Sequence, residues 1–249
     1  MKFKRIAFLM VISLFSFANS FCQSQEELIK TASNDTLNNE VRIGAIHKIQ
    51  SQKALADIVM NTVIKNIRRT AMSRITEEAL LIDIAKNSSY IDVRRVAIGK
   101  INDLNTLVYI AKHDEDMEAV RAAVKRINDQ NVLTDIARKS HFTEIRKFAI
   151  EKISDNSLLY SIVKDCEFPE ARKAAAEKIT DQKLLFDIAK NDKEDGIRFA
   201  AMNSLNNENI MNLLKSVTCQ QKKEVFNIAK TKLPPETINK LASENKGCI

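Results

Sequence analysis

Three histidines are the first residues to consider, because imidazole moves protons and binds metals near neutral pH. His47 falls within an expected helix, whereas His113 and His141 fall in expected loops. The acidic run 114–116 follows His113 and could hold a metal ion. The same run suits the start of the next helix, whose N-terminal end favours carboxylates, and we prefer this interpretation. Because no histidine or cysteine pair has zinc-site spacing, the sequence predicts no metal site.

The other residue types that do covalent or phosphate chemistry also fail to form a set. Cys166 lies in an expected loop without a repeated histidine partner. The chain has 4 glycines, too few for a phosphate-binding loop, and it lacks the G-x-S-x-G nucleophile motif. Carboxylates recur at helix starts and do not form an isolated pair. We therefore predict that the chain is not an enzyme and has no catalytic or cofactor-binding residues.

Basic residues, in contrast, recur at fixed spacing. A first row lies within the apolar arc of its helices, so its arginines should lie on the core and pair with carboxylates or helix-end carbonyls. Its members are Arg42, Arg68, Arg94, Arg146, Arg172 and Arg198, with Val120 in the fourth place. A further row lies in the last helical turn, where cations suit the negative helix end. This last-turn row consists of Arg74, Lys100, Arg126, Lys152 and Lys178.

A third basic row faces away from the core, about 200° around the helix from the first apolar position. It consists of Arg69, Arg95, Arg121, Lys147 and Lys173. This row and the last-turn row could be a solvated face or a positive stripe for an anionic partner. Glutamate would serve solubility equally well, yet cations fill five consecutive repeats of the outward row. We predict that the outward row binds a partner presenting acidic groups; the first-helix surface and the loops are the alternative sites.

A strict 26-residue repeat positions these rows and runs without insertion or deletion from Val41 to Leu205. One row of small residues is Ala45, Ala71, Ala97, Ala123, Ala149, Ala175 and Ala201. A second core row is Ile49, Ile75, Ile101, Ile127, Ile153, Ile179 and Leu205. A third core row is Leu55, Leu81, Leu107, Leu133, Leu159, Leu185 and Met211. A fixed period of this size is typical of a solenoid.

Each repeat should contain two short helices, such as 93–101 followed by 102–112, because apolar residues recur there with helical spacing. Carboxylates should cap both kinds of helix. Those before the first helices are Asp103, Asp129, Asp155 and Asp181, and those before the second helices are Asp92, Glu118, Glu144 and Glu170. Helices of about ten residues are marginal alone, so neighbouring repeats must stabilise them. The alanine row would let helix backbones approach closely.

The sequence therefore predicts an all-α fold, an α-solenoid built as a superhelix of stacked two-helix repeats. We expect an N-terminal capping helix over 23–40 and 26-residue repeats over 41–205. The register breaks after Leu205, where we place two added residues near 215–223. Residues 206–249 should form a degenerate repeat and C-terminal cap.

Residues 1–22 have the pattern of a signal peptide, with a basic start, an apolar run over 6–17 and small residues at 18–20. Cleavage after Ser20 or after Cys22 fits this pattern, and a lipidated Cys22 is a further alternative. We predict export to the periplasm or beyond the cell, without stable membrane insertion after cleavage. Removing three positive charges with this segment lowers the formal net charge from +7 to +4.

Export would permit disulfides among the 4 cysteines. Cys219 lies in the register break and Cys248 near the chain end, so a bridge between them would staple the tail to the cap. Cys166 would then stay free. Three free thiols are an equally good alternative, because spacing alone does not fix the geometry.

The repeat resembles HEAT-type α-solenoid repeats. The resemblance lies in the pattern L-x-x-I-A-K, followed by an acidic loop and then by V-R-x-x-A-x-x-K-I-x-D. The short period is similar to that of the leucine-rich-repeat-variant subtype. The resemblance covers roughly residues 25–242 and implies an interaction scaffold. An iron–sulfur cysteine cluster can precede the repeats of that subtype, but Cys22 stands alone in this region and we expect no such cofactor.

Two functions fit these patterns. The first is a non-enzymatic, exported scaffold that binds a protein or peptide along its repeat surface. The second is a binder of nucleic acid or another anionic polymer through the basic rows. The export signal, the modest net charge and the scarcity of aromatic residues for base stacking favour the first.

Overall fold

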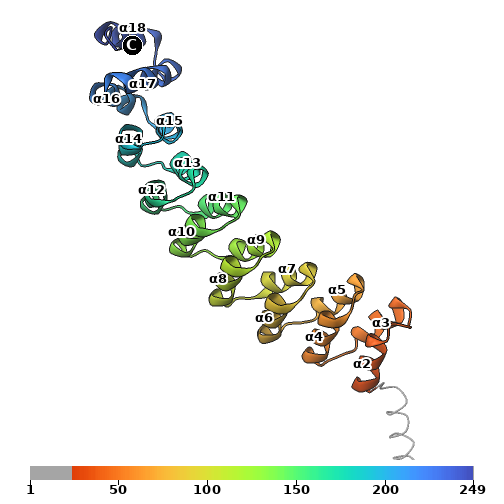
Figure 1. The fold of residues 1–249 in the computed structure, drawn as a ribbon. Coiled ribbons are helices and arrows are strands. Elements are labelled where there is room, and N and C mark those ends of the chain that lie inside the picture. Colours follow the sequence, from red (N-terminus) through yellow and green to blue (C-terminus); the bar gives the residue numbers. More distant parts are fainter. Residues whose placement is uncertain (1–23, 249) are drawn as a thin grey trace, which may run out of the picture. The chain divides into compact units, whose positions relative to one another are not determined.

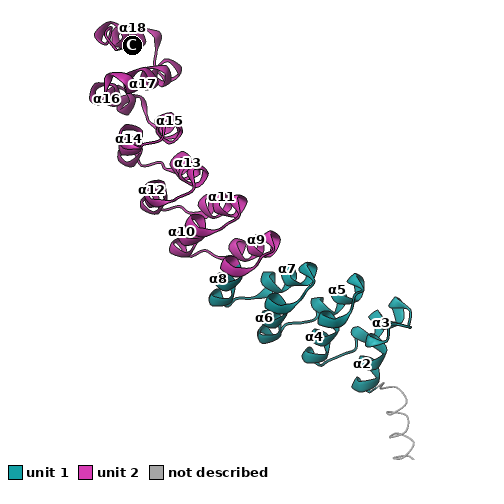
Figure 2. Cartoon of the chain, in the orientation of Figure 1, with its two compact units in different colours: residues 1–110 teal, residues 111–249 magenta. Residues whose placement is uncertain are grey.

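The computed structural model describes residues 24–248, and all regular elements in that range are α-helices (Figure 1). The predicted signal peptide lies outside the described residues. The chain divides into two compact units, residues 1–110 and 111–249 (Figure 2). Helix α8 (Leu104–His113) runs across the boundary between them.

The first unit contains three helix pairs and most of α8. Its helices are α2 (Gln25–Ser33), α3 (Asn39–Ile46), α4 (Gln52–Asn61), α5 (Lys65–Ser73), α6 (Glu78–Asn87) and α7 (Ile91–Lys100). Even-numbered helices are the first helices of each pair and odd-numbered helices the second. Each first helix packs against its own second helix, and second helices pack against second helices of the next pair. Packing thus proceeds from neighbour to neighbour, as in a solenoid.

The second unit repeats this packing over a longer stretch. Its complete helices are α9 (Met117–Arg126), α10 (Gln130–Lys139), α11 (Thr143–Lys152), α12 (Asn156–Asp165), α13 (Pro169–Lys178), α14 (Gln182–Asn191), α15 (Asp195–Ser204), α16 (Asn207–Ser216), α17 (Cys219–Lys232) and α18 (Pro235–Glu244). From α9 to α17 each second helix packs on the next, and α18 packs on α17. Both units therefore confirm the predicted all-α, solenoid-like fold.

The alanine row explains how such short helices pack. All seven alanines are buried, six of them without any exposed surface. The isoleucine row that ends each second helix is buried to the same degree. Helix backbones can come close where the side chain is a single methyl group, and apolar rows above and below then close the core. The regular spacing of small and large residues thus specifies the packing directly.

Helix starts follow two different rules. Asp129, Asp155 and Asp181 are N-cap residues of first helices, as predicted, and their carboxylates accept backbone N–H groups of the first turn. The prediction was wrong for the second helices. Asp92 and Glu170 lie inside the first turn of α7 and α13, where Tyr90 and Phe168 are the N-cap residues. These carboxylates have another function, described below.

The register change near the C-terminus also differs from the prediction. Met211 was expected in the leucine row, but it is only half-buried, and Ile210 is buried in α16 instead. The core of α16 therefore begins one position earlier than the repeat requires. Val225 of α17 corresponds to Ile197 of α15 and stands two positions later than the repeat requires. Relative to the 26-residue repeat, one residue is thus lost before α16 and three are gained before α17. Helix α17 is the longest described helix, with 14 residues.

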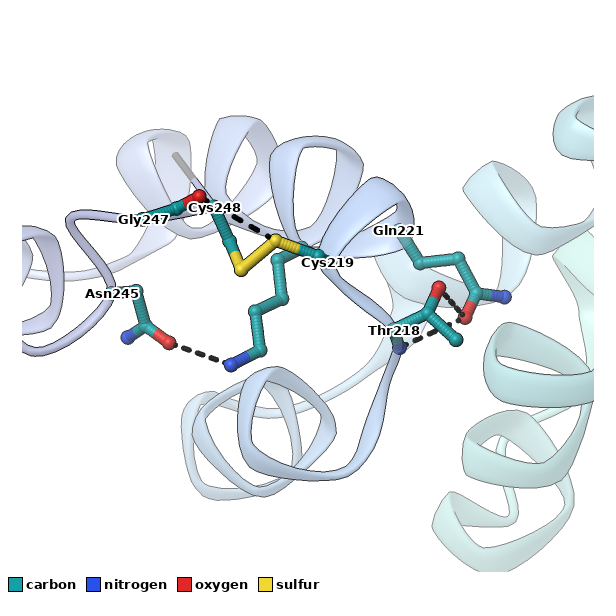
Figure 3. Close-up of a disulfide and its surroundings, with 7 residues drawn as sticks. Thr218, Cys219, Gln221, Asn245, Gly247 and Cys248 are labelled. Atoms are coloured by element: carbon teal, nitrogen blue, oxygen red, sulfur yellow. Dashed lines mark hydrogen bonds between the residues drawn. A yellow bond between two sulfur atoms is a disulfide. The ribbon is translucent and has the colours of Figure 1, made fainter.

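Of the two alternatives for the cysteines, the structure has the bridge. Cys219 and Cys248 form a disulfide with a Cα–Cα distance of 4.9 Å (Figure 3). Cys219 is the first residue of α17, and Lys222 of the same helix donates a hydrogen bond to the Asn245 side chain at 2.9 Å. The tail after α18 is thus held against the start of α17. Cys166 is a buried free thiol.

This arrangement predicts the result of thiol counting. A chain that begins at Ser24 should show one reactive thiol, that of Cys166, when it is denatured without reductant. Prior reduction should raise the number to three. Three reactive thiols without reduction would contradict the bridge.

Candidate partner-binding surface

Five of the six arginines of the first basic row are buried, as predicted, and Arg94 is half-buried; Arg172 shows the geometry best. The Arg172 side chain is 6% exposed and that of Asp192 is 3% exposed. The guanidinium donates to both Asp192 carboxylate oxygens at 2.8 and 2.7 Å and to the Val163 carbonyl at 2.7 Å. It also pairs with Glu194. Charges buried this deeply are stable because each has a hydrogen-bonded partner.

Carboxylates of the following repeat are the usual partners of this row. Arg68 of α5 pairs with Asp92 of α7 at 3.3 Å, and Arg146 of α11 pairs with Glu170 of α13. Hydrogen bonding to Arg146 holds the pKa of the Glu170 carboxyl below its usual value. Carboxylates that were predicted to cap helices therefore bind arginines of the preceding repeat. These pairs fix the register of one repeat on the next.

Aromatic residues support the same contacts. The Arg68 guanidinium lies 3.8 Å from the centre of the Tyr90 ring, and that of Arg146 lies 3.8 Å from the centre of the Phe168 ring. Stacking of a planar cation on an aromatic face adds attraction without another charge.

One position in this row lacks its arginine. Val120 of α9 is buried there, while Phe142 and Glu144 follow at the spacings of the aromatic and acidic partners of Arg146. The partners have thus been retained in the sequence pattern at a place where the cation is missing.

The last-turn row is also engaged within the protein, though not as predicted. Lys100 donates to the carbonyls of Met72 and Ile75 at 3.0 and 2.9 Å, and Lys152 donates to the carbonyl of Val124 at 2.9 Å. These carbonyls end the second helix of the preceding repeat, whereas we expected each cation to stabilise its own helix end. Burial lowers the pKa of the Lys100 and Lys152 ammonium groups. Lysine thus caps its neighbour and joins two repeats.

A set of polar side chains, four amides and one carboxylate, joins the repeats at the first helices, and the sequence reasoning missed it. Gln52 donates to the Arg74 carbonyl at 3.1 Å and accepts from the Thr76 N–H at 2.8 Å. The equivalent residues that contact backbone groups of the next loop are Glu78, Gln130, Asn156 and Gln182. Their signal was a polar side chain at this place in each repeat, with Leu104 as the exception.

The outward row differs from the other two because all of its members are exposed. Arg69 and Arg95 belong to the first unit, on α5 and α7. Arg121, Lys147 and Lys173 belong to the second unit, on the consecutively packed helices α9, α11 and α13. We call these last three residues the cation stripe. The structure therefore brings three of the five predicted site residues together on one packed surface, and it describes the other two in their own unit.

Contacts of the cation stripe are weak and leave its charges accessible. The Arg121 guanidinium lies 5.1 Å from the centre of the Phe148 ring, and Lys173 lies 3.9 Å from Glu177 one helical turn later. An exposed ion pair of this kind contributes little to stability. A stripe that stabilises so little of the fold is available for a ligand.

The histidines do not form a site. His47 is the C-cap residue of α3 and His113 ends α8, so neither lies where we expected, and all three histidines are exposed. Asp116 caps α9 by accepting from the Glu118 and Ala119 N–H groups, which confirms the structural interpretation of the acidic run. Among residues 24–248, no group of three or more metal-binding side chains comes together. Within the same range, no helix is both long and apolar enough to cross a bilayer.

Comparison with known proteins adds little to this picture. No protein-family profile matches the chain, and no curated protein sequence does. Among solved structures, the X-ray structure of YibA from Escherichia coli is similar over 91% of this chain and 98% of its own, at 15% sequence identity and a TM-score of 0.35. A likeness of this size carries no functional argument. The helix packing within each unit itself defines the class: this chain is a helical repeat protein.

Proposed function

We propose that this chain is an exported, non-enzymatic scaffold of HEAT-like short repeats, and that it binds an acidic protein or peptide on the cation stripe. The observation that carries this proposal is the contrast among the three basic rows. The buried arginines bind carboxylates and the last-turn lysines bind carbonyls, so both have structural partners. The cation stripe has the same strict spacing, and its exposed contacts stabilise the fold little.

Two further observations support other parts of the proposal. The Cys219–Cys248 bridge fits the oxidising compartments to which the predicted signal peptide would direct the chain. The strongly engaged ionisable groups, such as Arg172 with Asp192, are explained by contacts between repeats. Such pairs need no catalytic function to account for them.

Charge reversal of the stripe tests the proposal. A chain beginning at Ser24 would be immobilised and used to capture proteins from the extracytoplasmic fraction of the source organism. Replacing Arg121, Lys147 and Lys173 by glutamate should remove the captured partner, because three attractive contacts become repulsive. Quantitative mass spectrometry of the bound proteins at increasing salt measures this loss.

A matched control reverses three exposed lysines of the same unit outside the stripe. Lys139→Glu, Lys183→Glu and Lys215→Glu lie on the first helices α10, α14 and α16, change the net charge equally and should leave capture intact. Equal capture by both triple variants would contradict the stripe as the site. Recovery of nucleic acid instead of protein, with a steep salt dependence, would favour the anionic-polymer alternative.

A further inference from the structure

A hollow lies beside the cation stripe, between α13, α15 and α17. It has a volume of about 320 Å³ and is lined by Lys173, Asp195, Gly196, Phe199, Met202 and Glu224. We call it the anchor hollow. Phe199 stands one repeat after Lys173, so it occupies the outward position that cations hold in the preceding repeats. Phe199 is 51% exposed, which is unusual for a phenylalanine.

Gly196 leaves the hollow open. A Cβ atom built on this glycine would meet no atom within 4 Å, so the space above the helix is empty there. Gly196 and Phe199 are three residues apart on α15 and therefore lie on the same helix face. The volume is at the lower end of the range for ligand sites, about 300–1,000 Å³. It suits one large apolar side chain packed against the exposed phenyl ring.

The helices that line the hollow carry different charges. Lys173 forms the α13 wall, from which the cation stripe continues to Lys147 and Arg121. The lining from α15 and α17 includes Asp195 and Glu224, and Arg198 binds both of them, at 2.7 and 3.0 Å. A ligand with carboxylates on the α13 side of an apolar group would be attracted by the α13 wall. Carboxylates near α15 and α17 would meet the two acidic residues, which disfavours them.

We propose that the anchor hollow receives one aromatic side chain of an extended acidic peptide whose carboxylates lie along the cation stripe. This proposal rests on the proposed function and adds to it the kind of sequence that is bound. A peptide in the extended polyproline II conformation rises about 3.1 Å per residue with three residues per turn, so every third side chain points the same way at intervals of about 9 Å. Packed helices lie about 8–10 Å apart. Every third residue of the peptide therefore meets a new helix. The ligand should have acidic residues at spacings of three, then an aromatic residue three positions beyond the last of them.

Two synthetic peptides test the proposal by fluorescence anisotropy with the chain that begins at Ser24. One has three glutamates at spacings of three followed by phenylalanine three positions later, and the other has alanine in place of the phenylalanine. The phenylalanine peptide should bind about tenfold more tightly, because the buried ring adds hydrophobic contact at equal charge.

Gly196→Leu fills the hollow from inside and should bring both peptides to equal affinity. The matched control is Gly44→Leu in α3, another helical glycine with nothing within 4 Å of a built Cβ, and it should preserve the preference. Circular dichroism verifies that each variant is folded. Persistence of the preference in Gly196→Leu would overturn the anchor hollow.

The stripe variant separates this proposal from the proposed function. If both peptides bind equally and the triple glutamate variant abolishes their binding, the stripe is the site and the anchor hollow is wrong. If neither peptide binds, or if the triple variant binds as well as the wild type, both proposals fail.

Discussion

Replacing Arg172 by methionine is expected to lower the free energy of unfolding by about 3–5 kcal/mol, because it leaves a buried carboxylate without its cation. The Asp192 side chain is 3% exposed and accepts two hydrogen bonds from this guanidinium. Methionine has a similar length and can cover the same apolar surface, so the lost charge dominates the effect. Urea denaturation followed by circular dichroism measures the change.

A second variant separates the buried charge from lost packing. Adding Asp192→Asn to Arg172→Met removes the unpaired charge and keeps an oxygen that can accept the Glu194 N–H, which lies 3.0 Å away. This double variant should recover part of the lost stability. The adjacent exposed change Lys173→Met should alter stability by no more than roughly 0.5 kcal/mol. Equal denaturation midpoints for the single and double variants would show that the ion pair does not determine stability here.

The rows whose members all have the same surroundings in the fold were predictable from the sequence. In a solenoid every repeat has the same neighbours, so a residue that returns once per repeat returns to the same place. The alanine row, the buried arginines and the exposed cations could therefore be assigned from helical angle alone. The partners of the arginines were harder to predict. A carboxylate at a helix start can stabilise the dipole of its own helix or pair with an arginine of the neighbouring repeat. The equal sequence separation of Arg68–Asp92 and Arg146–Glu170 was the available signal.

Features that depend on the spatial relation of two repeats could not be read from one repeat. Gln52 reaches backbone groups of the next loop, and Lys152 reaches carbonyls of the previous helix. Their regular spacing indicates that they have the same function in each repeat. It does not show whether each side chain contacts the preceding or the following repeat. The shift that brings Ile210 into the core in place of Met211 required the actual helix start of α16. The anchor hollow was missed because, in the sequence, Phe199 only marks the end of the cation row.

Ala123→Leu is expected to lower the free energy of unfolding by about 1–3 kcal/mol, because a larger side chain must be forced into close-packed space. Ala123 of α9 has no exposed surface, and every equivalent alanine in the described repeats is buried too. Lys125→Leu adds the same side chain to the same helix at an exposed position, so it should change stability by no more than roughly 0.5 kcal/mol. Thermal and urea denaturation of the two variants side by side measures the difference. A comparable loss in both would mean that leucine disturbs α9 wherever it is placed, and that the alanine row does not set the spacing of the second helices.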